Sequence, residues 1–128
     1  MKTLEELRKE KGTLVVAHRG SSAGNIPCNT MVAFDIAVRD GADVIELDLF
    51  RNVDGEIFIF HTGKEPSHID RHVHIESLTT KEILGLRRCN SDLIETFIGV
   101  ERFEDVLEHM RGKAVLNLDR CIDILDSV

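Results

Sequence analysis

Residues 44–61 read VIELDLFRNVDGEIFIFH, two apolar segments that are joined by a short polar turn. The high content of Val, Ile, Leu and Phe predicts strands over residues 44–50 and 56–61. The letters NVDG between them are typical of a tight reversal, so the two strands should form a hairpin. We expect a two-residue turn at Asp54-Gly55, which makes the numbers of paired residues sum to 109.

This register predicts a group of charged side chains at one end of the hairpin. It places Asp48 opposite His61, with Cβ atoms roughly 5 Å apart. Glu46 is two residues from Asp48 and therefore shares its face of the strand. A divalent cation would neutralise both carboxylates, with Asp119 from a later strand as a third oxygen ligand. Ion pairs on a half-exposed strand are the alternative, which the apolar residues on either side of these carboxylates disfavour.

Strands and helices alternate on both sides of the hairpin. Residues 13–18 (TLVVAH) and residues 113–119 (KAVLNLD) are apolar enough to predict buried strands. Capping residues followed by apolar residues at helical spacing predict helices between the strands. These helices are expected to begin after Thr3, Thr30 and Thr79, to include residues 103–110, and to begin again near residue 121.

An alternation of strands and helices indicates a parallel sheet, either open or closed into a barrel. In an open sheet a ligand lies between two strands, whereas in a barrel catalytic groups come from many strand ends. Here polar residues end four strands, which favours the barrel. They are His18 with Arg19, Glu46 with Asp48, His61, and Asn117 with Asp119.

The length sets a limit on how much of a barrel the chain can form. Its 128 residues are expected to be a single domain, 1–128, with about four strands. An eight-stranded barrel needs about 250 residues. We therefore expect the N-terminal half of a barrel, whose remainder comes from a longer chain or from self-association.

Composition excludes several classes of protein. The net charge is −7 and the acidic residues are scattered, so no basic surface for nucleic acid is expected. No apolar run approaches the roughly 20 residues that span a bilayer, and the N-terminus does not resemble a signal peptide. The cysteines Cys28, Cys89 and Cys121 form no C-x-x-C pair, which favours free thiols and a cytoplasmic location.

An ordered set of short motifs resembles the first half of a glycerophosphodiester phosphodiesterase. The resemblance implies a TIM-type (β/α)8 barrel of the phosphodiesterase type, of which this chain supplies roughly the first half. It also implies hydrolysis of a glycerophosphodiester to glycerol 3-phosphate and an alcohol. The motifs are His18-Arg19-Gly20, Pro27-x-Asn29-Thr30, Ala33-Phe34, Gly41-Ala42-Asp43, Glu46-x-Asp48, Asp54-Gly55, His61 and, more loosely, Leu116-Asn117-Leu118-Asp119.

The resemblance also implies a role for each site residue. His18 and His61 correspond to the general acid and base of the family. Glu46 and Asp48 correspond to ligands of Mg²⁺ or Ca²⁺, and Arg19 corresponds to a phosphate contact. The chemistry is consistent, because a metal ion and a guanidinium draw charge from a phosphodiester while two imidazoles transfer protons.

The sequence departs from the family pattern in three places. Cys28 replaces a glutamate, Thr62 replaces an aspartate, and a Glu-x-Lys motif reads Asp119-Arg120-Cys121. These changes leave open a divergent, weakly active or non-catalytic relative that acts as a binding or scaffold protein.

A second group of possible ligands lies in the segment EPSHIDRHVH, residues 65–74. His68, His72 and His74 have a spacing found at metal sites. No apolar strand leads into this segment, so a flexible surface loop is the favoured interpretation.

Overall fold

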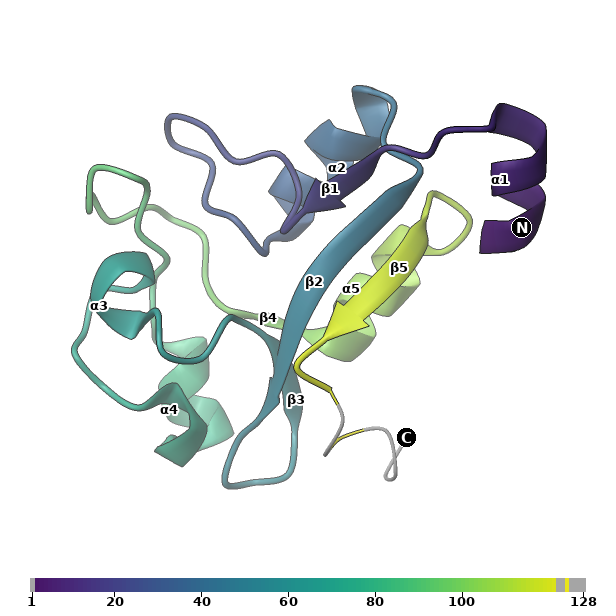
Figure 1. Ribbon diagram of the computed structural model, residues 1–128. Coiled ribbons are helices and arrows are strands. Elements are labelled where there is room, and N and C mark those ends of the chain that lie inside the picture. Colours follow the sequence, from purple (N-terminus) through teal and green to yellow (C-terminus); the bar gives the residue numbers. More distant parts are fainter. Residues whose placement is uncertain (1, 122–123, 125–128) are drawn as a thin grey trace.

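A long central strand, β2 (Val44–Arg51), organises the fold, and the other strands pair with it or with its hairpin partner (Figure 1). The structure is a computed structural model that describes residues 2–121 and 124. In chain order the remaining elements are α1 (Leu4–Lys11), β1 (Val16–His18), α2 (Met31–Arg39), β3 (Ile57–Ile59), α3 (Glu65–His68), the 3-10 helix η1 (Ile75–Ser77), α4 (Thr80–Leu84), β4 (Glu101–Arg102), α5 (Phe103–Met110) and β5 (Val115–Asp119).

The sheet has a parallel part and an antiparallel part. β1 and β5 lie parallel to the first half of β2, one on each side. β3 pairs antiparallel with the second half of β2, and the two-residue strand β4 pairs with β3. The α/β class is therefore confirmed, and three of these five strands have the parallel arrangement of a barrel wall.

The hairpin register differs from our prediction by one residue. Leu49 pairs with Ile59, so the paired numbers sum to 108 and not to 109. The cause is the turn: the N–H of Asn52 donates to the carbonyl of Glu56, which leaves a three-residue loop. Gly55, with φ +82°, supplies the left-handed residue that such a loop requires.

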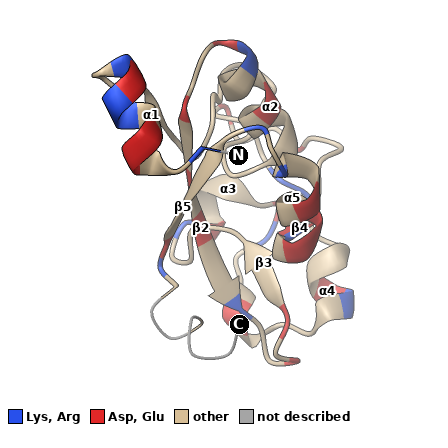
Figure 2. Cartoon of the chain, turned by 90° about the vertical axis from the view of Figure 1, so that its right-hand side faces the viewer, with Lys and Arg blue, Asp and Glu red and all other residues tan. Residues whose placement is uncertain are grey.

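The two faces of β2 pack against different parts of the chain. Helices α2 and α5 lie on one side of the sheet, as the rotated view shows (Figure 2). The odd-numbered residues of β2 are buried against them because side chains alternate along a strand. This core contains Ile45, Leu47, Leu49, Ile59, Phe34, Ala37, Phe103, Val106 and Met110. The even-numbered residues Glu46 and Asp48 therefore point to the other face.

The segment between β3 and β4 contains short helices and contributes to a second core, which we did not expect. Phe50, Phe58 and Phe60 pack there with Ile69, Ile75, Ile83, Leu86 and Val100. Glu65 in α3 is buried, and its carboxylate accepts the N–H of Ile75 at 3.2 Å. The prediction of a surface loop at residues 65–74 is therefore wrong in part, because Glu65 and Ile69 are buried.

The capping residues correctly predicted three helix starts. Thr3 and Thr79 each form a capping box, and the hydroxyl of Thr30 accepts the N–H of Ala33. The helix expected near residue 121 lies largely outside the described residues. Among the described residues, no helix has the length and apolar character of a membrane span.

Candidate active site

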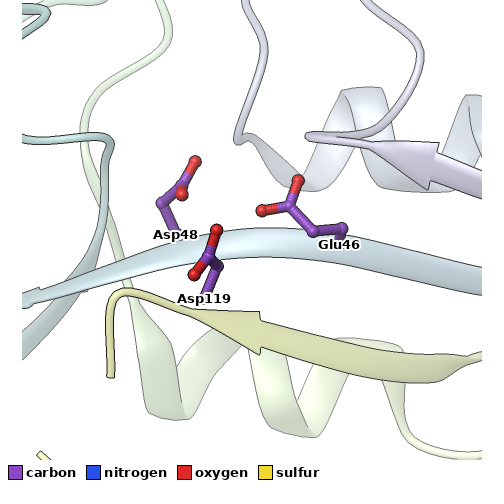
Figure 3. Close-up of side chains that lie close together, drawn as sticks. All are labelled: Glu46, Asp48 and Asp119. Atoms are coloured by element: carbon purple, nitrogen blue, oxygen red, sulfur yellow. The ribbon is translucent and has the colours of Figure 1, made fainter. Parts of the chain in front are cut away.

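Three carboxylates converge on the face of the sheet opposite α2 and α5. One oxygen each from Glu46, Asp48 and Asp119 lies within 4.8 Å of the others (Figure 3). The strand register explains this, because Glu46 pairs with Asn117 and Asp48 pairs with Asp119 in parallel strands. Asp48 is 1% exposed and Glu46 is 8% exposed, whereas Asp119 lies at the exposed rim.

The charges of this cluster are only partly balanced. Burial, followed by the repulsion of Asp48 and more weakly of Asp119, raises the pKa of Glu46, and nearby His18 opposes the shift. The guanidinium of Arg19 lies beside Asp48, with Nε 3.2 Å from Oδ2. All-oxygen donors with an excess of negative charge suit a hard divalent cation. The residues present therefore fit the metal that the sequence predicted.

His18 and Arg19 reach the cluster because β1 ends beside Glu46. His18 is the register partner of Glu46, and its Nε2 is 3.6 Å from Oε2 of that residue. The His18 side chain is 73% exposed, so it remains open to a ligand. The N–H of Arg19 donates to the carbonyl of Glu46 at 2.9 Å, and its backbone has a left-handed φ of +59°.

Gly20 makes the sharp turn after Arg19 possible. Its φ is +81°, and a Cβ at this position would lie 2.7 Å from the backbone carbon of Ala33 in α2. Only glycine therefore allows the loop to pass this close to the helix while Arg19 faces Asp48.

His61 lies one position away from the place we predicted. Phe60, not His61, lies opposite Asp48, and its N–H donates to the carbonyl of Asp48 at 3.0 Å. The imidazole of His61 instead contacts Thr62 O through Nδ1 at 2.9 Å and Arg120 through Nε2 at 3.2 Å. Arg120 directly follows Asp119, so His61 is connected to the rim of the carboxylate cluster.

Sequence reasoning gave no site role to Asn29, which holds Asp48 in place. The amide of Asn29 donates to Oδ2 of Asp48 at 2.9 Å, and its oxygen accepts the N–H of Asp48 at 3.3 Å. Asn29 is buried with a left-handed φ of +55°, a conformation that asparagine tolerates better than most residues. An Asn before the helix cap Thr30 was the available signal.

Arg88 is a second residue that the sequence analysis missed. It is 1% exposed, lies over the ring of Phe60, and donates to the carbonyls of His68 and Asn29. One guanidinium nitrogen is 3.9 Å from the sulfur of Cys28. Burial lowers the pKa of Arg88. No helical or strand spacing in the sequence indicated a role for Arg88, because this residue lies in an irregular segment.

The histidines at 68, 72 and 74 form no comparable group. The only set of three possible ligands that comes together within residues 2–121 and 124 is Glu46, Asp48 and Asp119. His68 packs against Phe60, and burial lowers its pKa.

Comparison with known proteins identifies the family. The sequence profile of the glycerophosphoryl diester phosphodiesterase family matches residues 18–124. A glycerophosphodiester phosphodiesterase of Bacillus altitudinis is 33% identical over 110 residues, which cover 84% of this chain and 44% of that protein.

Solved structures of similar proteins support the same assignment. The crystal structure of glycerophosphodiester phosphodiesterase from Agrobacterium tumefaciens has a TM-score of 0.73 and 29% identity, covering 83% of this chain and 46% of that one. An Oleispira antarctica phosphodiesterase in complex with the product sn-glycerol-3-phosphate has a TM-score of 0.69 and 26% identity, covering 83% and 43%. The chain thus spans less than half the length of these relatives, consistent with a partial TIM barrel. It belongs to the glycerophosphoryl diester phosphodiesterase family.

Proposed function

We propose that this chain carries the metal and phosphate site of an enzyme that hydrolyses a glycerophosphodiester to glycerol 3-phosphate and an alcohol. The observation that carries the proposal is the convergence of Glu46, Asp48 and Asp119 beside His18 and Arg19. Membership of the family supports the substrate class, as does the relative that was captured with sn-glycerol-3-phosphate.

The three carboxylates would hold one divalent cation, Mg²⁺ or Ca²⁺. When bound, the cation would supply positive charge to the phosphoryl oxygens of the substrate. Glu46 and Asp48 provide buried oxygens on one strand, and Asp119 provides a third from the neighbouring strand. Both cations take oxygen ligands, and this donor set does not distinguish them.

Arg19 is the proposed phosphate contact. Its Nε is buried and has no hydrogen-bond partner, although it lies 3.2 Å from a carboxylate oxygen of Asp48. A guanidinium presents several donors in one plane, so it can attract Asp48 and still offer N–H groups to a phosphate. Asp48 would in this way orient Arg19 toward the substrate.

His18 and His61 are the proposed proton-transfer groups. His18 ends β1 and His61 follows β3, so the two rings would approach the substrate from different parts of the sheet. Imidazole can both donate and accept protons near neutral pH, and the reaction requires one group for each task. One ring would remove a proton from the nucleophile, and the other would protonate the leaving alkoxide.

The edges of the parallel sheet support a further part of the proposal. β1 and β5 are its outer strands among the described residues, and Val15 and Val16 are more than half exposed. Unpaired strand edges readily pair with further strands. We propose that the remaining strands come from a longer chain or from a second copy. Analytical ultracentrifugation distinguishes an assembly from a stable monomer, and a stable monomer that turns over substrate would contradict this part.

The compartment remains our sequence-based proposal of the cytoplasm. Cys28, Cys89 and Cys121 are all unpaired. Free thiols are typical of a reducing compartment.

The test is release of glycerol 3-phosphate from glycerophosphocholine with Mg²⁺ or Ca²⁺. We expect chelator and His18→Ala to abolish the release. His72→Ala, which removes an exposed histidine outside the site, should leave it unchanged. Binding of glycerol 3-phosphate without turnover would favour the alternative, a non-catalytic binding protein. If the protein neither binds glycerol 3-phosphate nor turns over glycerophosphocholine, the proposal is contradicted.

A further inference from the structure

Arg120 contacts both the carboxylate cluster and His61. It follows Asp119 with a left-handed φ of +56°, and its N–H donates to Oδ1 of Asp119 at 2.8 Å. Its guanidinium turns back toward the segment after β3. One nitrogen lies 3.2 Å from Nε2 of His61, and the other donates to the hydroxyl of Thr62 at 3.3 Å.

These contacts determine where the hydrogen of the His61 ring must be. A guanidinium has only donors, so Nε2 must accept. The other ring nitrogen, Nδ1, is 2.9 Å from the carbonyl oxygen of Thr62, which can only accept. Both hydrogen bonds form only if the ring is neutral and carries its hydrogen on Nδ1. A free histidine side chain favours the opposite tautomer, with the hydrogen on Nε2.

The surroundings of Arg120 also favour a role in ligand binding over a purely structural one. Arg120 is exposed. Together with Asp119, Thr62 and Glu76 it lines an open cavity of about 660 Å³. A phosphate in this cavity would meet the guanidinium beside the third carboxylate of the cluster.

We propose that Arg120 is a positioning residue, which holds His61 in the Nδ1–H tautomer and makes Nε2 the proton acceptor of the site. Nε2 becomes available when the phosphate of a substrate draws the guanidinium away from it. The role of Nε2 as proton acceptor rests on the proposed function, whereas the tautomer does not.

The tautomer is measured by long-range ¹H–¹⁵N correlation spectra of the 128-residue chain at pH 8, with the His61 signals assigned from His61→Gln. We expect a protonated Nδ1 and an unprotonated Nε2. Arg120→Met removes the donors and should make the Nε2–H form the major one. Arg120→Lys keeps a donor and should retain the Nδ1–H form.

Arg111→Met is the matched control, because Arg111 is exposed on the helical side and pairs with Glu108. It should leave the His61 signals unchanged. An Nε2–H tautomer in the parent chain would overturn the inference. So would an Nδ1–H form that persists in Arg120→Met, because the carbonyl of Thr62 would then suffice alone.

A second measurement tests the release of Nε2. Adding sn-glycerol 3-phosphate should shift the Nε2 signal of the parent chain but leave that of Arg120→Met unaffected. An equal shift of the Nε2 signal in the parent chain and in Arg120→Met would contradict the release of Nε2 by Arg120. Neither spectrum requires turnover, so loss of the proposed activity and loss of this inference can be told apart.

Discussion

Replacing Asn29 tests how the site is held together, because this residue connects the loop after β1 to Asp48. Asn29→Ala removes a 2.9 Å hydrogen bond to a buried carboxylate, and such bonds contribute roughly 1.5–3 kcal/mol. It also places alanine at φ +55°, and a left-handed conformation costs a non-glycine residue roughly 1–2 kcal/mol. We expect a loss of about 2.5–5 kcal/mol in the free energy of unfolding.

This loss is large relative to the stability of a typical domain, about 5–15 kcal/mol. Urea unfolding followed by far-ultraviolet circular dichroism measures it, since the chain has no Trp or Tyr for fluorescence. Divalent cations are left out so that no bound ion compensates for the lost hydrogen bond to the Asp48 carboxylate.

Asn29→Gly is the matched variant, because glycine lacks the amide but adopts the left-handed conformation without strain. It should be more stable than Asn29→Ala by on the order of 1 kcal/mol. If the free energy of unfolding of Asn29→Ala lies within about 1 kcal/mol of the parent value, the hydrogen bond to Asp48 does not make the net contribution expected of such bonds.

Two further predictions concern the loop after β1 and the start of α2. Gly20→Ala would bring a Cβ to 2.7 Å from the backbone of Ala33, so we expect severe destabilisation in thermal unfolding. A Cβ at Gly63 would meet open space, so Gly63→Ala should lose only about 1–2 kcal/mol of stability. Equal losses would contradict the steric argument. Glu101 accepts the N–H of Met31, and burial raises its pKa above the ordinary value of 4.5. The contribution of Glu101 to stability therefore falls as the pH rises from this value through the raised pKa. The stability of Glu101→Gln should rise relative to the parent between pH 4 and 8. A difference in the free energy of unfolding that stays constant over this range would refute the prediction.

The sequence predicted the parallel part of the sheet better than the hairpin. The caps at Thr30 and Thr79 depend on neighbouring residues, and the structure agrees with them. The strand predicted over residues 13–18 is present only as β1 and is mostly exposed, so the prediction that it is buried is wrong. The register depends on the turn, where the hydrogen bond from the N–H of Asn52 to the carbonyl of Glu56 leaves a three-residue loop in place of the predicted two-residue turn. That change moved His61 out of the position opposite Asp48.

The site was predictable where its residues end strands, and less so elsewhere. Glu46, Asp48 and Asp119 lie on adjacent parallel strands, so their convergence follows from the alternation of side chains and the strand order. Arg88 and Arg120 lie in irregular segments. Their contacts depend on long-range folding of the chain, and no spacing in the sequence encodes them.

Diffraction from crystals grown with Mn²⁺ tests the central claim most directly, because Mn²⁺ occupies oxygen sites of this kind and scatters anomalously. We predict one anomalous peak within roughly 2.0–2.6 Å of oxygens from Glu46, Asp48 and Asp119, and its loss in Asp48→Asn. A peak elsewhere, or an ordered site whose three carboxylates bind no ion at saturating Mn²⁺, would contradict the claim that they form a metal centre.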